Sequence, residues 1–290
     1  MSSLFNSKTK SRDDLFKRLC DDHRYSRQRE IVDDLWVRFQ PFADKNFPKA
    51  IASDFHSRFW EMYLACTLTD LGFKLHPRRI AEGPDISLNA GNMDIWIEAV
   101  APHAGQSLEM SLTEDRDELI LIDDAVTLRY CSAIDEKFKK YSSYLENEVI
   151  SKTEPYIIAV NGCNVPFSLS SDEPPDLIPN IVRAVLPFGE YTSIIDRDSS
   201  QVVGYTYPYR DQIVKESRAG VPTNIFLNSK YAGISGIIFS NDSLISMPKK
   251  VGEGLLFVHN PNARNRLSQG WLRAGCEYWL DEQTLRKKVW

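Results

Sequence analysis

Three carboxylates between residues 61 and 98 have the side-chain type that metal-assisted phosphate chemistry requires. Asp85 follows Pro84, Glu98 comes thirteen residues later, and Glu61 lies upstream of both. Cleavage of a phosphodiester needs a divalent ion that organises an attacking water and neutralises charge on the phosphate oxygens. Proteins hold Mg²⁺ through one or two carboxylates, with waters and phosphate oxygens completing its shell. Asp85 and Glu98 are therefore candidate ligands for Mg²⁺, or for Mn²⁺ in its place.

Hydrophobic periodicity predicts the elements that hold these carboxylates. A helix that Ser53 or Asp54 can cap, and that Gly72 ends, is followed by segments of period two, the last two of which flank a polar turn at 89–92. Such a pair of segments is typical of a β-hairpin. A second helix and a strand buried on both faces follow. In chain order, these elements are expected at residues 53–71, 73–76, 85–88, 94–100, 123–148 and 156–160.

The strand at 94–100 has one polar and one apolar face. Side chains alternate along a strand, so Glu98 shares a face with Trp96 and Val100. The opposite face, with two isoleucines and Ala99, is expected to point into the core. Directly opposed residues on paired strands have Cβ atoms about 4.5–5.5 Å apart, a separation that allows Asp85 and Glu98 to bind one ion.

This order of elements, with Pro84-Asp85, Glu98 and Glu61, resembles the PD-(D/E)xK nuclease superfamily over roughly residues 50–165. In that superfamily an Asp and a Glu on adjacent antiparallel strands converge, and a helix upstream often adds a further acid. The resemblance implies an α/β fold with a mixed central sheet flanked by helices and a restriction-endonuclease-like core. It also implies a Mg²⁺-dependent nuclease in which Glu61 positions water or a second ion. The carbonyl of Ala99 would be a third metal ligand.

The sequence departs from the superfamily pattern at one catalytic position. The superfamily has a Lys two residues after its Glu, and here that position is Val100. Valine can neither orient a water nor stabilise an oxyanion. Members of the superfamily can carry this residue on a neighbouring helix, which makes Lys137 and Lys140 candidates because they share a helical face with Tyr144. Lys139 lies between them, and His103, just beyond the strand, is a weaker candidate.

Each acid also has an ordinary structural interpretation. A Pro-Asp pair is common in turns, a Glu at a strand edge is often solvated, and Glu61 is compatible with the polar face of a helix. The alternative function is therefore a catalytically inactive nuclease-fold subunit that binds nucleic acid or forms a complex. The two hypotheses differ in whether a lysine amine reaches the carboxylates.

The overall charge neither demands nor excludes a nucleic-acid partner. The net charge is -5 and the pI about 5.6, unlike a strongly basic nucleic-acid-binding domain. A local cluster of basic residues is enough to bind phosphates. DNA is expected rather than RNA, in restriction or phage defence, and a homodimer or a partner protein of a defence system stays open. The basic clusters are Arg78-Arg79, Lys137-Lys139-Lys140, Arg264-Arg266 and Arg286-Lys287-Lys288.

Cysteine usage and hydropathy favour a cytoplasmic protein. The cysteines number five, are widely spaced and form no CxxC, which is typical of reduced thiols. The sequence contains no apolar run of about 18 residues, so no membrane span is expected.

Three regions are expected along the chain: an N-terminal helical segment (1–50), the nuclease-like core (51–165) and a β-rich extension packed on it (166–290). Tyr205, Tyr207 and Tyr209 alternate along the extension, and a packed sheet face is favoured over base stacking as their role. Strand-like segments of the extension, the first two forming a hairpin, lie at 191–195, 202–207, 223–227, 234–239 and 254–258.

Overall fold

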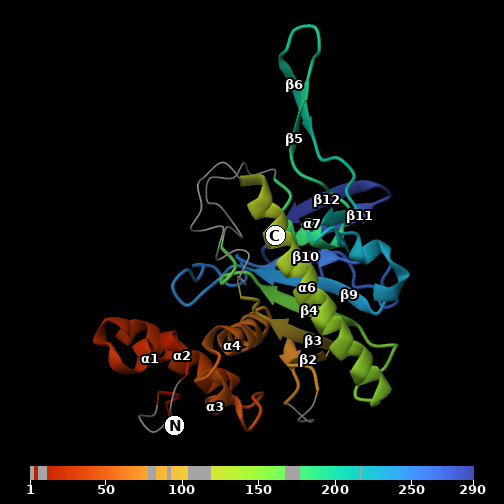
Figure 1. Ribbon diagram of the computed structural model, residues 1–290. Helices are drawn as coiled ribbons and strands as arrows, with labels where there is room; N and C mark the ends of the chain where they lie inside the picture. The colour runs from red at the N-terminus through yellow and green to blue at the C-terminus, as the bar shows by residue number, and fades with distance from the viewer. Residues whose placement is uncertain are drawn as a thin grey trace.

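One mixed sheet organises the part of the chain that is described by this computed structural model (Figure 1). Eight strands lie in the order β1-β2-β3-β4-β9-β10-β11-β12, with helices on both faces. The predicted α/β class, with a mixed central sheet flanked by helices, is confirmed. The described residues are 3–5, 12–77, 83–89, 93–103, 119–166, 177–215 and 217–290.

The first half of the chain supplies most of the helices and four of the strands. None of the helices in the described ranges has the length and the apolar composition that crossing a bilayer requires. The helices are α1 (Asp14–Asp21), α2 (Ser26–Phe39), α3 (Phe47–Ile51), α4 (Phe55–Asp70) and α6 (Leu119–Glu146), with the 3₁₀ turn η1 (His23–Tyr25). The strands are β1 (Lys74–Leu75), β2 (Ile86–Asn89), β3 (Asp94–Val100) and β4 (Tyr156–Asn161).

Strands β1 to β4 form one half of the sheet. β1, β2 and β3 are successive antiparallel neighbours, and Ile86 pairs with Ile97 across β2 and β3. β4 is parallel to β3 and is reached through α6. Parallel neighbours need a long crossover connection, which α6 provides. The turn predicted at 89–92 lies outside the described residues except for Asn89.

The two faces of this half-sheet belong to two hydrophobic clusters. Ile95 and Ile97 of β3 pack with α4 and the N-terminal helices, whereas Trp96 and Val100 pack on the α6 side. The alternation of β3 is therefore as the sequence predicts. Every side chain of β4 is buried, as expected for a strand covered on both faces.

Helix α4 is fixed to the sheet by a hydrogen bond as well as by packing. The indole Nε1 of Trp60 donates to the carbonyl of Ala159 on β4 at 3.0 Å, and Trp60 is 1% exposed. At the start of α4, the Asp13 carboxylate accepts from the Phe55 amide at 3.1 Å, and its other oxygen caps α1. These contacts set the position of every side chain that α4 presents to the sheet.

The second half of the chain extends the same sheet. β9 is parallel to β4, β10 is antiparallel to β9, and β11 and β12 follow outward. The added strands are β9 (Ile234–Ser240), β10 (Leu256–His259), β11 (Cys276–Asp281) and β12 (Thr284–Val289). Before β9 in the chain lie α7 (Asn180–Val185) and the short strands β7 (Gln212–Val214) and β8 (Gly220–Pro222), which pair with each other.

The strand predicted at 223–227 is wrong. This segment contains the 3₁₀ turn η2 (Ile225–Leu227), closed by a bond from the Leu227 amide to the Asn224 carbonyl and followed by η3 (Ser229–Tyr231). Ile225 and Phe226 are both buried although they are adjacent, a pattern that a strand with one buried face does not give. A short apolar run fits a buried turn as well as a strand.

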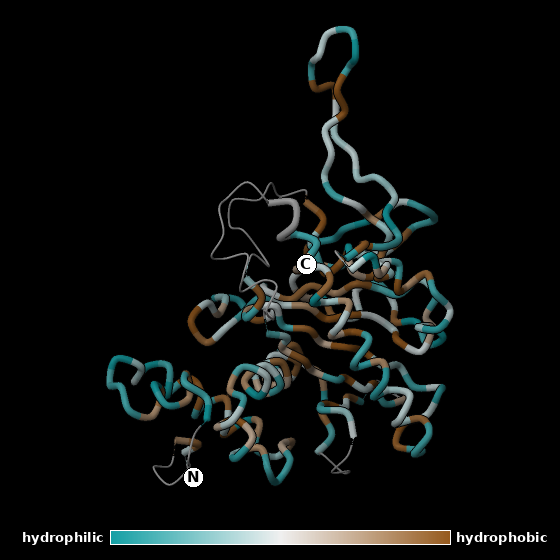
Figure 2. Tube along the Cα trace, in the orientation of Figure 1, coloured by the Kyte–Doolittle hydropathy of each residue, from teal (hydrophilic) through white to brown (hydrophobic). Residues whose placement is uncertain are grey.

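Strands β5 (Thr192–Ile195) and β6 (Val202–Thr206) form the predicted hairpin, which projects from the body as an arm at the top of Figure 1. The expectation that its tyrosines form a packed sheet face is wrong, because Tyr205 is 56% and Tyr209 71% exposed. The apolar stretch of the arm is the brown segment near its end in Figure 2. Tyr205 is exposed on the arm, whereas Tyr209 follows the hairpin and forms a bridge with Phe188.

The contact between α4 and β4 predicts a large stability effect. Trp60→Phe removes the bond to Ala159 and leaves buried space, so the free energy of unfolding should fall by about 2–3 kcal/mol. Trp279→Phe at a half-buried position of β11 is the matched control, with an expected loss below about 1 kcal/mol. Urea denaturation of both variants measures this, and equal losses would contradict the assigned role of Trp60.

Candidate active site

Glu98 is a charged side chain inside the protein. It lies on β3, is 1% exposed, and points to the face of the sheet that α6 covers. A buried carboxylate without partners is costly, so the interactions around it determine what the site can do.

Helix α6 provides three hydrogen-bond donors to this carboxylate. Lys137 and Lys140 place their Nζ atoms 2.8 and 2.9 Å from the same oxygen, Oε1 of Glu98. The hydroxyl of Tyr144 donates to the other oxygen, Oε2, at 3.2 Å. The three residues are spaced i, i+3, i+7 and therefore form one stripe on the helix. Both candidate lysines thus reach the site.

These contacts decide the protonation of Glu98. Burial raises the pKa of its carboxyl, but the charges of Lys137 and Lys140 and their hydrogen bonds outweigh burial and hold the pKa below its ordinary value. Burial lowers the pKa of Lys140, yet the charge and hydrogen bond of Glu98, with the charge of Asp85, raise it overall. The site at neutral pH is therefore ionised.

Asp85 lies beside Glu98 on the neighbouring strand. Ile86 pairs with Ile97, so one further step of the antiparallel register brings Asp85 opposite Glu98. Its Oδ2 accepts a hydrogen bond from the backbone amide of Ala99 at 2.8 Å. Both acids therefore meet at the same point of the β2–β3 pair. The carbonyl of Ala99 stays a predicted metal ligand, since the contact to Asp85 is made by its amide.

Glu61 is paired with an arginine that the sequence reasoning missed. Arg58, one turn earlier on α4, places Nη1 2.6 Å from Oε2 of Glu61, and Glu61 is 1% exposed. Burial lowers the pKa of Arg58, but the charges of Glu61 and then of Asp85 raise it overall, so Arg58 lies within electrostatic range of both acids. An arginine three residues before an acid on a helix was the available signal.

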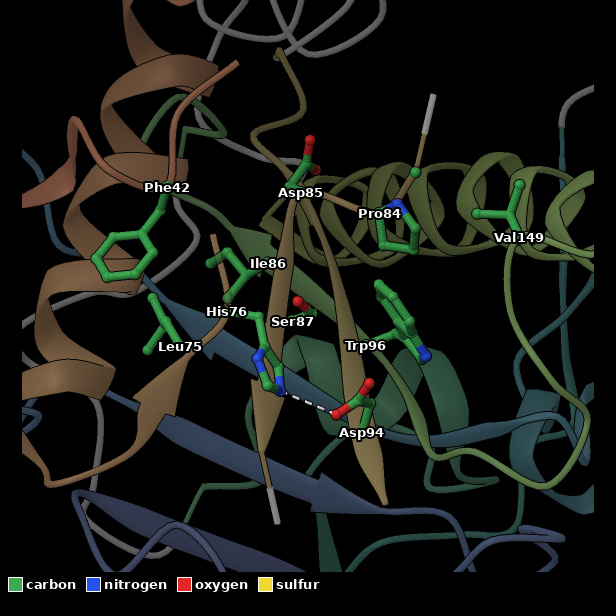
Figure 3. A pocket seen from close by; sticks show the side chains of 11 residues that line it. Phe42, Leu75, His76, Pro84, Asp85, Ile86, Ser87, Asp94, Trp96 and Val149 are labelled. Carbon is green, nitrogen blue, oxygen red and sulfur yellow. Dashed lines mark hydrogen bonds and ion pairs between the residues drawn. The ribbon is translucent and has the colours of Figure 1, made fainter. Parts of the chain in front are cut away.

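A pocket of about 190 Å³ opens next to Asp85 at the edge of the sheet (Figure 3). In this view Asp85 lies at one end and the pair of His76 and Asp94 at the other, with His76 Nε2 3.0 Å from Asp94 Oδ1. Its described lining residues are Phe42, Leu75, His76, Gly83, Pro84, Asp85, Ile86, Ser87, Asp94, Trp96 and Val149.

The donor chemistry suits a hard divalent cation, with one constraint. Asp85 and Glu98 are carboxylates on neighbouring strands, the ligand type that Mg²⁺ prefers. Within the described ranges, however, no three side chains of His, Cys, Asp and Glu converge as metal ligands. Oε1 of Glu98 already accepts from two ammonium groups. An ion bound here would therefore be held by two carboxylates and completed by water or substrate oxygens.

The other candidate residues lie away from the carboxylates or outside the described chain. Val100 is half-buried on the α6 side of β3, and His103 is exposed, with its carbonyl accepting from Arg129 at 2.8 Å. Lys139 pairs with Asp135 at 2.9 Å rather than with Glu98. The clusters Arg264-Arg266 and Arg286-Lys287-Lys288 are exposed, the latter on β12 at the far edge of the sheet. Arg78-Arg79 lies outside the described residues.

No family model, no curated protein and no solved structure matches this chain. A function for the chain therefore has to come from the geometry of its own residues.

The lysine pair predicts a pH-dependent stability. Replacing both Lys137 and Lys140 with Met leaves Glu98 as a buried charge without its cations, which should cost about 3–5 kcal/mol at pH 7. In the intact protein the lowered pKa of Glu98 stabilises the fold above the ordinary carboxyl range, and this contribution is lost as pH falls through the lowered value. In the double variant the pKa of Glu98 rises instead, so folding becomes less favourable as pH increases.

The deficit of the double variant should therefore be largest near neutral pH and shrink as the pH approaches the ordinary range of a glutamate. Urea denaturation at several pH values measures it. Lys139→Met, on the same helix but paired at the exposed surface, should leave the free energy of unfolding nearly unchanged at every pH. A deficit that is independent of pH would contradict an ionised, lysine-stabilised Glu98.

Proposed function

We propose that this chain is a metal-dependent nuclease that cleaves phosphodiester bonds, with DNA as its substrate. The observation that carries the proposal is the convergence of two lysine ammonium groups, 2.8 and 2.9 Å from Glu98, next to the strand that begins after Asp85. Val100 occupies the position where the superfamily pattern has its lysine. Both lysines come instead from the helix that follows the strand.

The arrangement of the core supports the same proposal. In chain order it is α4, three antiparallel strands, the crossover helix α6, and β4 parallel to β3. This order is compatible with the restriction-endonuclease-like core that the resemblance implies, with the acids on β3 and just before β2. Fold alone does not determine function, so the acids and lysines carry more weight than the topology.

The residues divide the chemistry among them. A bound Mg²⁺, held by Asp85 and Glu98, would supply a polarised water and neutralise phosphate charge. Lys140 has a side chain that is 49% exposed, so its ammonium can contact a phosphate oxygen of a substrate and stabilise charge developing there. Lys137 is 10% exposed and holds Glu98 ionised and oriented.

Glu61 and Arg58 complete the site from the opposite side. The superfamily pattern gives the upstream acid a role in positioning water or a second ion. In this chain the pairing of Glu61 with Arg58 supports a role through the arginine, whose charge acts on Asp85. Glu61 is thus proposed as a positioning residue.

The biological setting is proposed from the resemblance. Restriction or phage defence in the cytoplasm is the expected role, with a homodimer or a partner protein of a defence system as the assembly. All five cysteines are free, which is compatible with a reducing compartment.

A second candidate function is supported by the hydrogen bonds that Glu98 already accepts. Both of its oxygens already accept hydrogen bonds, from Lys137 and Lys140 on one and Tyr144 on the other. A carboxylate satisfied in this way needs no metal. The same residues would then be the remnant of a catalytic site in a subunit that binds nucleic acid or forms a complex. Cleavage assays separate the two candidates directly.

Neutralising either acid should abolish cleavage. Asp85→Asn and Glu98→Gln keep the side-chain shape but remove a charged metal ligand, so cleavage of plasmid and linear DNA with Mg²⁺ or Mn²⁺ should fall at least about 100-fold. Asp281→Asn, which removes one exposed negative charge on β11, is the matched control and should cut normally. If the Asp85→Asn variant cleaves DNA as fast as the wild-type chain, this site is ruled out. If the wild-type chain does not cleave DNA, the second candidate is favoured.

The two lysines should have different effects. Lys140→Met should lower the rate of cleavage by about 100-fold or more with little loss of stability, because its ammonium is accessible to substrate. Lys137→Met should lower stability more than Lys140→Met does, because its ammonium is the more buried partner of Glu98. Cleavage rates and urea denaturation of both variants, beside Lys139→Met, measure this. Full cleavage by Lys140→Met would exclude it as the catalytic cation.

A further inference from the structure

The pocket in Figure 3 lies at the edge of the sheet beside the candidate active site, and its lining residues come from both faces. Asp94, Trp96 and Glu98 alternate on β3 and so share a face. Ser87 pairs with Trp96, and Asp85 lies two residues before Ser87. Residues two apart on a strand are about 6.6–6.8 Å apart, so Trp96 and Ser87 lie one such step from the two acids. That step is comparable to the separation between a nucleotide's phosphate and its base.

The walls of the pocket suit a flat aromatic ligand. Trp96 is held in position by a hydrogen bond from its Nε1 to Glu154 Oε2 at 2.9 Å. Pro84 lies near it in Figure 3, whereas Phe42 and Leu75 line the pocket on the other side of β2. A volume of about 190 Å³ is below the roughly 300–1,000 Å³ of sites for drug-sized ligands, so one ring system is the expected occupant.

Polar groups stand where the edge of such a ring would need them. His76 and Asp94 form a pair at the end away from Asp85, and Ser87 adds a half-buried hydroxyl. Together they offer donors and acceptors for the hydrogen-bonding edge of a heteroaromatic ring. Apolar walls with convergent polar groups at one end are typical of a specific ligand pocket.

We propose that this pocket binds the unpaired base of a nucleotide next to the cleaved phosphate. The inference rests on the proposed nuclease function and names its substrate class: single-stranded nucleic acid, or a duplex with an extruded nucleotide. A base in an intact duplex is stacked and paired, so it cannot enter a pocket beside the acids until it leaves the stack. Stacking on Trp96 supplies the affinity, and the pair of His76 and Asp94 contacts the ring edge.

The test compares DNA with and without bases. Binding is measured in EDTA, so that no cleavage occurs, to a single-stranded thymidine oligomer, to an abasic oligomer of equal length, and to a duplex. The wild-type chain should bind the thymidine oligomer about 10-fold more tightly than the abasic one. Trp96→Ala and Ser87→Phe, which respectively remove the stacking surface and fill the pocket, should abolish that difference. Trp96→Phe keeps an aromatic ring and should retain most of it.

Controls keep the outcomes distinct. Ser193→Phe, on the exposed strand β5, makes the same substitution outside the pocket and should bind like the wild type. Ser87→Phe decides the question if Trp96→Ala fails to fold. Equal wild-type binding of the thymidine and abasic oligomers, or an unchanged preference in Ser87→Phe, overturns the pocket inference while plasmid cleavage still supports the nuclease. A wild-type chain that neither binds nor cuts DNA overturns both.

Discussion

The candidate site depends on the burial of a single negative charge. Glu98 is 1% exposed, and a charge at such a position is tolerated only with partners that replace water. Its partners come from one stripe of α6. The same contacts therefore constrain the rotation of this helix about its axis and its position along β3. The same helix is the crossover between β3 and β4, which are parallel neighbours in the sheet. The charge and the local topology are therefore mutually dependent.

Local periodicity was enough to predict this part of the molecule. The alternation of β3 identifies which face Glu98 occupies, and the spacing of Lys137, Lys140 and Tyr144 identifies the stripe of α6. Both are properties of a few consecutive residues, which sequence patterns report directly. The sequence named both lysines as candidates but could not tell which of them contacts Glu98. The pattern does not determine where along β3 the helix α6 packs.

Features that depend on the rest of the fold were not predictable in this way. Tyr205 alternates like a residue of a packed sheet but lies on a projecting arm, where its ring stacks on Tyr191 and stays 56% exposed. The apolar pair Ile225 and Phe226 has the composition of a strand but fills a buried 3₁₀ turn. The i, i+3 spacing made Arg58 a possible partner of Glu61, but the burial that makes the pairing necessary was not visible in the sequence. In each case, tertiary contacts override a local preference.

The charges around the site balance before any ligand arrives. Three acids, Glu61, Asp85 and Glu98, face three cations, Arg58, Lys137 and Lys140, through the direct contacts and electrostatic ranges described above. A divalent cation bound alone would leave two positive charges in excess in a partly buried site, and a polyanion bound alone would leave an excess of negative charge. Both penalties are reduced when the ion and phosphate groups bind together, because their charges compensate at short range. If metal and nucleic acid bind here as proposed, a balanced network of this kind would favour their binding together, and the contacts of the two lysines with Glu98 would not exclude the proposed chemistry.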